Sequence, residues 1–375
     1  MPVKYKKLLI LVMFVSLLCG CEIKYYTPDN EESNKQTTNN NSANNNNNYI
    51  NDWDFKGTIN YANGTSAKLS SEKVYEKGVK STVYVISTTL NTVYLGSGVF
   101  FSEDDRYAYL FTNAHVISDS IEVEVIYSNY KRSQAYIVGY NSLEDVAVLA
   151  VEKNTNYSIA TLRNREDLSV AEGVLTIGTP ISTDYNFTAT AGILSKINSP
   201  LTSTIDETYN LLLLQIDATL NSGNSGGPLF DMYGNLIGLN TMKILRDNNN
   251  SEVDDLNFAI PIDRAVFIAN KIFEGIPYTR GLLGISIYDI VDLSISDRNS
   301  YNISLEHGLY VESVSTTGAS KNILQDGDII TKIEGVSFTN KITFQKELYD
   351  KAKGENVTLT IYRNNTYQEV TITLN

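Results

Sequence analysis

Between residues 71 and 273 the hydrophobic residues fall into short runs that are separated by turn-forming residues. The runs are rich in β-branched and aromatic residues, clusters such as Tyr233-Gly234-Asn235 interrupt them, and long stretches with helical spacing are nearly absent. This pattern predicts an all-β domain that is large enough to bury its own core, with one short helix at 262–273. The expected strands are 82–87, 93–101, 107–111, 121–127, 135–140, 146–151, 174–178, 211–216 and 236–240.

The pattern changes after residue 273, where the connector Gly275-Ile276-Pro277 leads into a second unit at 278–375. In this unit the spacing of apolar residues predicts a helix near 343–353 and closing strands at 357–362 and 369–374. We therefore expect a small β-rich second domain with one or two helices.

The first residues have the layout of an export signal. Lysines at positions 4, 6 and 7 precede a largely apolar run at 8–18, which is shorter than the roughly 20 residues that span a bilayer. Cys19-Gly20-Cys21 follows this run, so we expect a signal over residues 1–20.

Residues 21–70 are predicted to be a flexible tether. The segment from residue 22 onward is polar and low in complexity, with asparagine-rich stretches at 39–41 and 44–48, and it cannot bury enough apolar surface to fold by itself. Three aromatic residues, Trp53, Phe55 and Tyr61, are exceptions that could dock on the folded domain or on a neighbouring subunit.

The segment Gly223-Asn224-Ser225-Gly226-Gly227-Pro228 places one serine among small, turn-permissive residues. Such a cluster is also typical of a plain surface turn. A nucleophilic serine requires a base within hydrogen-bond reach and a third group that orients the base. The chain has two histidines: His307 lies in a polar stretch, whereas His115 follows the expected strand 107–111 and would emerge at its end.

The pair Glu144-Asp145 stands directly before the expected strand 146–151. A solvated turn carboxylate is the simpler explanation of either residue taken alone. The order along the chain, however, is His115, then Asp145, then Ser225, which is the order of a chymotrypsin-type triad. The sequence therefore predicts a nucleophilic serine site at these three residues.

Seven motifs in this region resemble, in order, those of the HtrA/Deg family of trypsin-like serine proteases. They are Gly96-Ser97-Gly98-Val99, Thr112-Asn113-Ala114-His115-Val116, Asp145-Val146-Ala147-Val148-Leu149, Gly192-Ile193-Leu194-Ser195, Asp217-Ala218, Gly223 to Pro228 and Phe258-Ala259-Ile260-Pro261. The resemblance implies a trypsin-like double β-barrel over residues 71–273. It also implies that Ser225 attacks the scissile carbonyl, that His115 transfers the proton, and that Asp145 orients His115.

Further site residues follow from the resemblance. The backbone N–H groups of Gly223 and Ser225 would form the oxyanion hole. Thr219 lies six residues before the nucleophile, at the base of the primary pocket of trypsin-like folds, and Leu220 and Leu239 would be its walls. Because this pocket offers no carboxylate to a basic side chain, we expect cleavage after small or medium aliphatic residues such as Val, Ile or Ala.

Asn224 stands where trypsin has the aspartate that pairs with a newly cut N-terminus. An asparagine cannot form that ion pair, so activation by clipping is not expected. As in the HtrA family, neighbouring loops would order the oxyanion loop, and the candidates are the polar segments 179–186 and 244–255.

In the second unit, Gly281-Leu282-Leu283-Gly284-Ile285 resembles the carboxylate-binding loop and first groove strand of the PDZ domains that HtrA proteases carry. A glycine-rich hairpin of an ordinary β domain is the alternative. In a PDZ domain, backbone amides hold a peptide carboxylate while the next strand edge accepts the peptide as an added strand. The resemblance assigns Leu282, Leu283, Gly284 and Ile285 to binding of peptide C-termini.

Leu18-Cys19-Gly20-Cys21 resembles a bacterial lipobox with Cys21 as the lipid acceptor, and an ordinary secretory signal is the alternative. The chain has two cysteines, so this assignment leaves no disulfide in the mature protein. The expected location is the outer face of a bacterial cell membrane. The resemblance also implies a homo-oligomer, a trimer formed through N-terminal aromatic residues.

The formal net charge of −13 argues against nucleic-acid binding and keeps the body of the protein off an anionic membrane surface, which leaves the lipid anchor as the only membrane contact. With two histidines and two N-terminal cysteines, we expect no metal and no organic cofactor.

The expected function is degradation of unfolded or damaged exported proteins. A chaperone or scaffold with minor proteolysis, and a processing protease for one dedicated target, are the alternatives.

Overall fold

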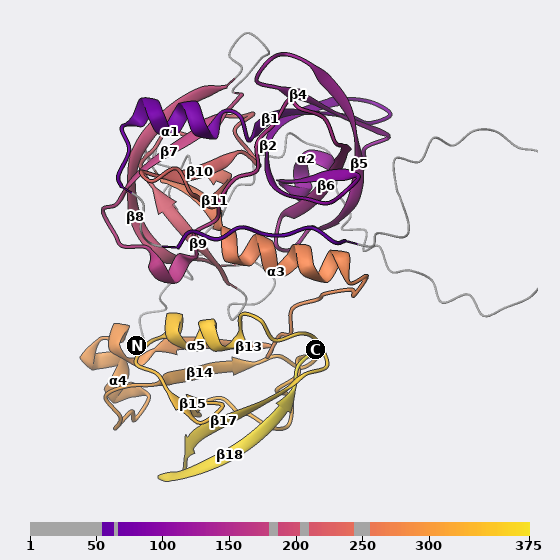
Figure 1. The fold of residues 1–375 in the computed structure, drawn as a ribbon. Helices are drawn as coiled ribbons and strands as arrows, with labels where there is room; N and C mark the ends of the chain where they lie inside the picture. The colour runs from indigo at the N-terminus through magenta and orange to yellow at the C-terminus, as the bar shows by residue number, and fades with distance from the viewer. Residues whose placement is uncertain (1–54, 64–66, 180–186, 203–209, 244–255) are drawn as a thin grey trace, which may run out of the picture. The chain divides into compact units, whose positions relative to one another are not determined.

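The computed structural model describes residues 55–63, 67–179, 187–202, 210–243 and 256–375. These residues form two compact units, both visible in Figure 1. The first unit contains most of the described residues up to 277. The second contains residues 278–375 together with the described part of 197–213.

The first half of the first unit is a closed six-stranded barrel in the order β1-β2-β3-β6-β5-β4. Closure leaves no strand edge exposed, and alternate side chains of every strand fill the interior. A short helix, α2 (Ala114–Ile117), follows the third strand. The strands are β1 (Thr82–Thr88), β2 (Val93–Glu103), β3 (Tyr107–Thr112), β4 (Glu122–Tyr127), β5 (Arg132–Asn141) and β6 (Val146–Glu152).

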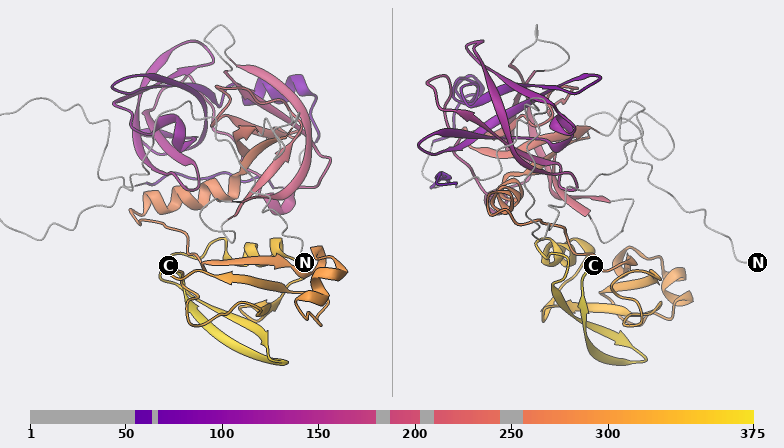
Figure 2. Two further views of the ribbon diagram at one scale, coloured as in Figure 1. Left: turned by 180° about the vertical axis from the view of Figure 1, so that it is seen from behind. Right: turned by 90° about the vertical axis from the view of Figure 1, so that its right-hand side faces the viewer.

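A second closed barrel follows, in the order β10-β11-β12-β9-β8-β7, and Figures 1 and 2 show it next to the first. Helix α3 (Ile262–Phe273) packs against β5 and β6 of the first barrel and against β11 and β12 of the second. It therefore joins the two barrels. The strands are β7 (Gly173–Gly178), β8 (Thr188–Thr202), β9 (Asn210–Ile216), β10 (Pro228–Asp231), β11 (Leu236–Lys243) and β12 (Asn257–Pro261). Helix α1 (Ser71–Gly78) and the 3-10 turn η1 (Arg165–Asp167) complete the unit.

The predicted all-β double barrel is confirmed, and each of the nine expected strands is present with small changes at its ends. The helix at 262–273 is confirmed as α3. The pattern missed β8, β10, β12, α1 and α2. β8 alternates small polar residues with few large apolar ones, β10 and α2 have four residues each, β12 has five, and α1 buries only Val74 and Gly78, so none of them carries a strong periodic signal.

The segment before α1 contacts the first unit. Phe55 stacks on Phe273 of α3 with 3.9 Å between ring centroids, and its edge meets Tyr109 at 5.1 Å. Tyr61 forms a parallel bridge with Leu162. Of the three aromatic residues expected to dock, Phe55 therefore packs on the barrels and Tyr61 pairs through its backbone, while Trp53 lies outside the described residues.

The second unit is a sheet in the order β13-β14-β15-β17-β18, with β16 paired to β15. Helix α5 (Lys341–Leu348) begins earlier than predicted, because the side chain of Asn340 caps it by accepting the N–H of Thr343 at 3.0 Å; it also ends earlier than predicted. The strands are β13 (Ile285–Asp289), β14 (Leu309–Val314), β15 (Ile329–Ile333), β16 (Val336–Ser337), β17 (Asn356–Arg363) and β18 (Thr366–Thr373). The helices are η3 (Ile290–Asp292), α4 (Ile295–Ser300) and α5 (Lys341–Leu348).

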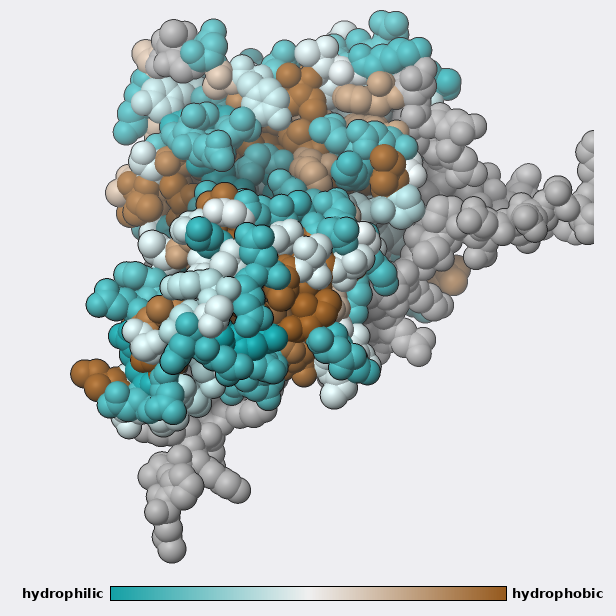
Figure 3. Space-filling view, turned by 90° about the horizontal axis from the view of Figure 1, so that it is seen from below, coloured by the Kyte–Doolittle hydropathy of each residue, from teal (hydrophilic) through white to brown (hydrophobic). Residues whose placement is uncertain are grey.

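The surface in Figure 3 is mostly hydrophilic and is interrupted by separate hydrophobic patches. Among the exposed large apolar side chains of the second unit are Val291, Ile295 and Tyr301, between β13 and β14. No helix in the described part of the chain combines the length and the apolar character that crossing a bilayer requires.

Candidate active site

The pairing of β3 with β6 brings His115 and Asp145 together. These strands are antiparallel, and Thr112 at the end of β3 lies opposite Ala147 at the start of β6. Residues just after β3 therefore lie beside residues just before β6. His115 emerges from the first turn of α2 rather than from the strand itself, and Asp145 occupies the turn between β5 and β6.

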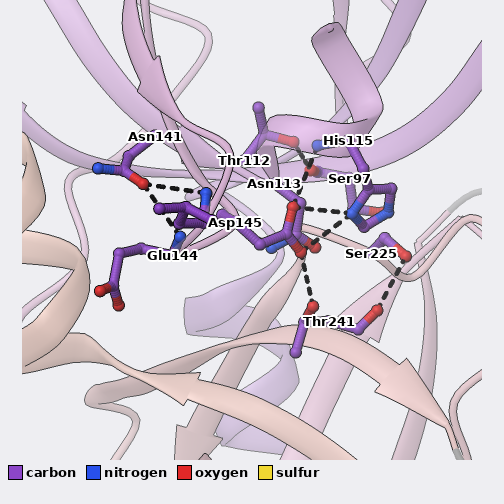
Figure 4. Close-up of polar contacts among 10 residues, drawn as sticks. Ser97, Thr112, Asn113, His115, Asn141, Glu144, Asp145, Ser225 and Thr241 are labelled. Carbon is purple, nitrogen blue, oxygen red and sulfur yellow. Dashed lines mark hydrogen bonds and ion pairs between the residues drawn. The ribbon is translucent and has the colours of Figure 1, made fainter. Parts of the chain in front are cut away.

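The Asp145 carboxylate is the centre of the site, as Figure 4 shows. Its two oxygens lie 2.9 and 3.0 Å from Nδ1 of His115, and Oδ1 also accepts the backbone N–H of His115 at 3.1 Å. Oδ2 accepts the hydroxyl of Thr241 at 2.7 Å. These contacts make Nδ1 the protonated ring nitrogen and leave Nε2 as the basic one.

Asp145 also has an unusual backbone. Its φ of +54° lies in the left-handed region, which an aspartate tolerates better than most residues. Its carbonyl accepts the side-chain N–H of Asn113 at 2.9 Å. The local conformation is therefore held by specific contacts, as strained positions require.

The electrostatics of the pair favour a charged imidazole. Burial lowers the pKa of His115, but the charge of Asp145 and its hydrogen bond raise the pKa by more, so the net direction is upward. The His115 side chain is still 52% exposed, while Asp145 is 19% exposed. Asp145 therefore holds the imidazole on its Nδ1 side, while about half of the side chain stays exposed to solvent.

Ser225 lies in the loop between β9 and β10, which contacts both barrels. Its carbonyl accepts the N–H of Ser97 in β2 at 2.8 Å. The next residue, Gly226, donates to the carbonyl of Asn240 in β11 at 2.8 Å and has φ +78°. A Cβ at Gly226 would collide with the Thr112 hydroxyl and the Ser97 carbonyl, so this position requires glycine.

The hydroxyl of Ser225 donates to the carbonyl of Thr241 at 3.4 Å, and the described residues contain no hydrogen bond from it to His115. Thr241 therefore contacts two of the three predicted residues, with its side chain on Asp145 and its carbonyl on Ser225. Thr241 was not predicted from the sequence. The only signal for it was its position at the end of the apolar run 236–240.

The two amides predicted for an oxyanion hole have no acceptor in the part of the chain that the structure describes. Within the described residues, neither the N–H of Gly223 nor that of Ser225 donates a hydrogen bond. Gly223 has φ +96°, and its carbonyl accepts the hydroxyl of Ser97 at 2.8 Å. Ser97 is completely buried and also accepts the N–H of Thr179 at 3.1 Å.

Ser97 is thus a second residue that was not predicted for the site, although it stands within one of the seven motifs. Its hydroxyl holds the Gly223 carbonyl and its backbone N–H holds the Ser225 carbonyl. One residue of the first barrel therefore fixes both ends of the loop segment that carries the two amides.

In the second unit, the loop before β13 is held by the end of the chain. Leu282 and Asn375 exchange backbone hydrogen bonds of 3.0 and 3.3 Å, and Gly284, with φ +70°, accepts the N–H of Ser315. The N–H of Leu283 donates to no acceptor among the described residues. Within the same residues β13 pairs only with β14, so its other edge faces away from the sheet.

Helix α5 starts beside this strand. The side chain of Asp289, at the end of β13, accepts the N–H of Lys341, the first residue of α5, at 2.8 Å. An open strand edge, a loop with an unused amide and a neighbouring helix are the parts that a PDZ domain uses to add a peptide strand.

Comparison with known proteins gives the same two parts. Residues 96–239 match the model of the trypsin-like peptidase domain, and residues 281–374 match the model of the PDZ domain. Over 274 residues the chain is 34% identical to the serine protease Do-like HtrA of Lactococcus lactis subsp. lactis, covering 72% of this chain and 67% of that protein. The chain belongs to the HtrA family of serine proteases.

Other relatives agree. The serine protease Do-like HtrA of Lactobacillus helveticus is 31% identical over 278 residues, covering 73% of this chain and 67% of that protein. The solved structure of the HtrA-type protease AlgW with tripeptide is 25% identical in sequence and superposes with a TM-score of 0.67. The match covers 81% of this chain and 96% of the AlgW chain. The protein is accordingly a serine-type endopeptidase with a PDZ domain.

The residues expected to line the primary pocket of this HtrA protease lie on two segments. Thr219 is exposed, and its carbonyl accepts the hydroxyl of Thr190 at 2.8 Å. Leu220 is 5% exposed and donates its N–H to the side chain of Asn257 at 3.3 Å. Leu239 is completely buried in β11.

Asn224 is 4% exposed, and its side-chain oxygen has no hydrogen-bond partner in the described part of the chain. It donates its backbone N–H to Asn221 at 3.0 Å. Of the two segments expected to order this loop, 179–186 is described only at Thr179, and 244–255 lies outside the described residues, as does Cys21.

Replacing Ser97 with alanine should lower kcat by about 10-fold, because the Gly223 carbonyl loses its donor and the loop with the two amides becomes less fixed. KM should change little. The matched control is Ser102→Ala, which removes another fully buried hydroxyl of β2, one that donates to Thr58 at 2.9 Å. Steady-state hydrolysis of a peptide substrate checks both variants, and equal kcat values for them would contradict this role of Ser97.

Proposed function

We propose that Ser225, His115 and Asp145 form the catalytic triad of a protease that degrades unfolded or damaged exported proteins. The observation that carries the proposal is the pair of contacts between the Asp145 carboxylate oxygens and Nδ1 of His115, at 2.9 and 3.0 Å. These contacts direct the basic Nε2 outward. The serine loop beside it is fixed to both barrels and, among the described residues, has two amides without internal acceptors.

In the proposed reaction, Ser225 Oγ attacks the scissile carbonyl carbon while Nε2 of His115 takes the hydroxyl proton. The N–H groups of Gly223 and Ser225 stabilise the resulting oxyanion. When the tetrahedral intermediate collapses, the C–N bond breaks and His115 returns the proton to the leaving amine. Water, activated by the same imidazole, then hydrolyses the acyl-enzyme.

The Ser225 hydroxyl must turn from the Thr241 carbonyl to His115 before it reacts. Its present hydrogen bond is long, at 3.4 Å, so a rotation about one side-chain bond costs little. Catalytic hydrogen bonds of free enzymes are often loose and tighten only when substrate is bound. The observed rotamer is therefore compatible with the proposed role.

The proposed pocket of Thr219, Leu220 and Leu239 contains no carboxylate, which disfavours a basic substrate side chain because its charge would lose water without gaining a partner. We assign to it a preference for Val, Ile or Ala before the cleaved bond.

The PDZ loop Leu282–Ile285 would bind the free C-terminus of a polypeptide. AlgW is described with a tripeptide, which supports peptide recognition. A fluorescent hydrophobic peptide should bind the full chain, and its C-terminally amidated form should not.

The lipoprotein assignment of Cys21, the placement on the outer face of a bacterial membrane and the trimeric state are further parts of the proposal. They rest on the signal-like layout of residues 1–21 and on the family resemblance. The mass of the membrane-extracted protein tests the lipid on Cys21, and its size in detergent tests the trimer.

The variant Ser225→Ala should lose cleavage of unfolded casein to the background level, because the proposed nucleophile is removed. The test also separates a protease from a chaperone. If the variant still prevents aggregation of an unfolded protein as well as the wild type does, the chain has both activities. Casein cleavage at the wild-type rate by this variant would overturn the proposed function. If the wild type cleaves only one of several unrelated unfolded proteins, the result would favour a dedicated processing protease.

The variant Asp145→Asn should lower kcat by about 10⁴-fold, because the amide no longer fixes the reactive tautomer of His115. The pH dependence should also move. The base must be neutral, so activity rises as pH increases through the pKa of His115, which Asp145 holds above its ordinary value. Without that charge the pKa falls, and the acidic limb of kcat/KM shifts to lower pH. The activity of Ser225→Ala gives the background, and a limb that shifts to higher pH would contradict the assignment.

A peptide library should be cut mainly after Val, Ile or Ala, as identified by mass spectrometry of the products. Thr219→Asp introduces a carboxylate at the expected base of the pocket, so it should raise cleavage after Lys or Arg by about 10-fold or more. Dominant cleavage after Lys or Arg by the wild type would refute the pocket assignment without affecting the triad.

A further inference from the structure

Glu144 is a buried carboxylate at a place where an exposed one is normal. It lies in the four-residue turn between β5 and β6, where Asn141 and Val146 are paired across the strand ends. Turn residues are usually solvated, yet the Glu144 side chain is only 1% exposed. In Figure 4 the Glu144 side chain points away from the His115–Asp145 pair.

The partner of Glu144 is Arg264, which lies 120 residues later on α3. Nε of Arg264 donates to Oε2 at 2.9 Å and Nη2 donates to Oε1 at 2.6 Å, so the guanidinium grips both oxygens. Arg264 is also 1% exposed, and its guanidinium lies 4.7 Å from the ring centroid of Phe267. A two-bond contact of this kind fixes direction as well as distance.

The pair connects the turn to the helix that joins both barrels. Helix α3 packs against β5 and β6 on one side and against β11 and β12 on the other, and β11 carries Thr241. The same turn is tied inside the first barrel, because the Asn141 side chain accepts the N–H groups of Leu143 and Glu144, each at 3.0 Å. Glu144 is therefore fixed both by its own barrel and by the helix that joins the two.

Glu144 and Asp145 are adjacent, so the position of one constrains the other. Asp145 has a left-handed backbone, which its surroundings must hold in place. Its carbonyl is held by Asn113 and its carboxylate by His115 and Thr241. Further support comes from the preceding residue, and that residue is held by Arg264.

Removing Arg264 would leave a buried carboxylate, that of Glu144, without the charge and the two hydrogen bonds of the guanidinium. Such a group either takes up a proton or moves toward water. Movement would pull on the Asp145 backbone directly, and small displacements of a catalytic group can reduce rates strongly.

We propose that Arg264 and Glu144 are positioning residues for the proposed catalytic Asp145, holding the turn that presents its carboxylate to His115. This inference rests on the proposed triad. It assigns to a buried ion pair a role in the reaction rather than in stability alone, since such pairs often contribute little to net stability.

The first test is the steady-state kinetics of Arg264→Met. We expect kcat to fall by between about 10-fold and 100-fold while KM stays within about twofold, because substrate contacts are unchanged and only the base is displaced. Arg264→Lys keeps the charge but not the two-bond geometry, so it should recover part of the loss.

The matched control removes a different ion pair from the same helix. Arg165 Nη2 lies 2.9 Å from Oδ2 of Asp263, the residue next to Arg264, and the two side chains are 10% and 30% exposed. Arg165→Met should therefore leave kcat close to wild type. Equal loss of kcat in Arg165→Met and Arg264→Met would show a general effect of α3 and overturn the proposal.

A double variant keeps the test decisive if Arg264→Met fails to fold. Glu144→Leu with Arg264→Met replaces the ion pair by an apolar pair, a change that buried pairs often tolerate in stability. The proposal expects this folded variant to keep a reduced kcat. A wild-type kcat in the double variant would show that the directional contact is not needed and would overturn the proposal.

A spectroscopic readout separates this proposal from the proposed function. The proton shared by Asp145 and His115 should give a strongly downfield NMR signal, and His307→Gln assigns it because the chain has only two histidines. We expect the signal to weaken in Arg264→Met and to persist in Arg165→Met; an unchanged signal overturns the positioning role. A serine-directed phosphonate that fails to label the wild type would instead overturn the proposed triad itself.

Discussion

The carboxylate of Asp145 is the point on which the site depends, because it accepts hydrogen bonds from both barrels. His115 reaches it from the first barrel and Thr241 from the second. A carboxylate with these donors can neither rotate nor approach the imidazole from another direction. The relative placement of the two barrels thereby fixes the tautomer and the orientation of the His115 side chain.

The serine loop is built by the same principle. Ser97 from the first barrel and Asn240 from the second hold the backbone on either side of Ser225, the proposed nucleophile. Two glycines with positive φ allow the backbone to approach these strands closely. The amides of Gly223 and Ser225, which we propose as the oxyanion hole, are thus positioned before any substrate is present, the condition under which backbone dipoles stabilise developing charge most effectively.

Helix α3 has a larger role than its length suggests. It follows β12, the last strand of the second barrel, in the sequence, and it contacts strands of both barrels. The ring of Phe55 stacks on it, and it carries Arg264. Contacts from three separate parts of the chain therefore converge on one helix. The PDZ unit, in contrast, has a core of its own, in which Ile287, Leu309 and Phe344 are buried, so the features that we propose for peptide binding depend on its own sheet and helix.

The sequence by itself determined the double barrel, the PDZ domain and the identity of three chemically capable residues. Strand runs with β-branched residues and the motifs around His115, Asp145 and Ser225 are local, and local patterns can be recognised one segment at a time. Only the tertiary structure decided that Thr241 and Ser97 contact the predicted site residues and that Arg264 pairs with Glu144, the neighbour of Asp145. Their partners lie between 96 and 126 residues away in the chain. Although Ser97 stands within a recognised motif, no local pattern shows which remote residue each of the three contacts until folding places the two side by side.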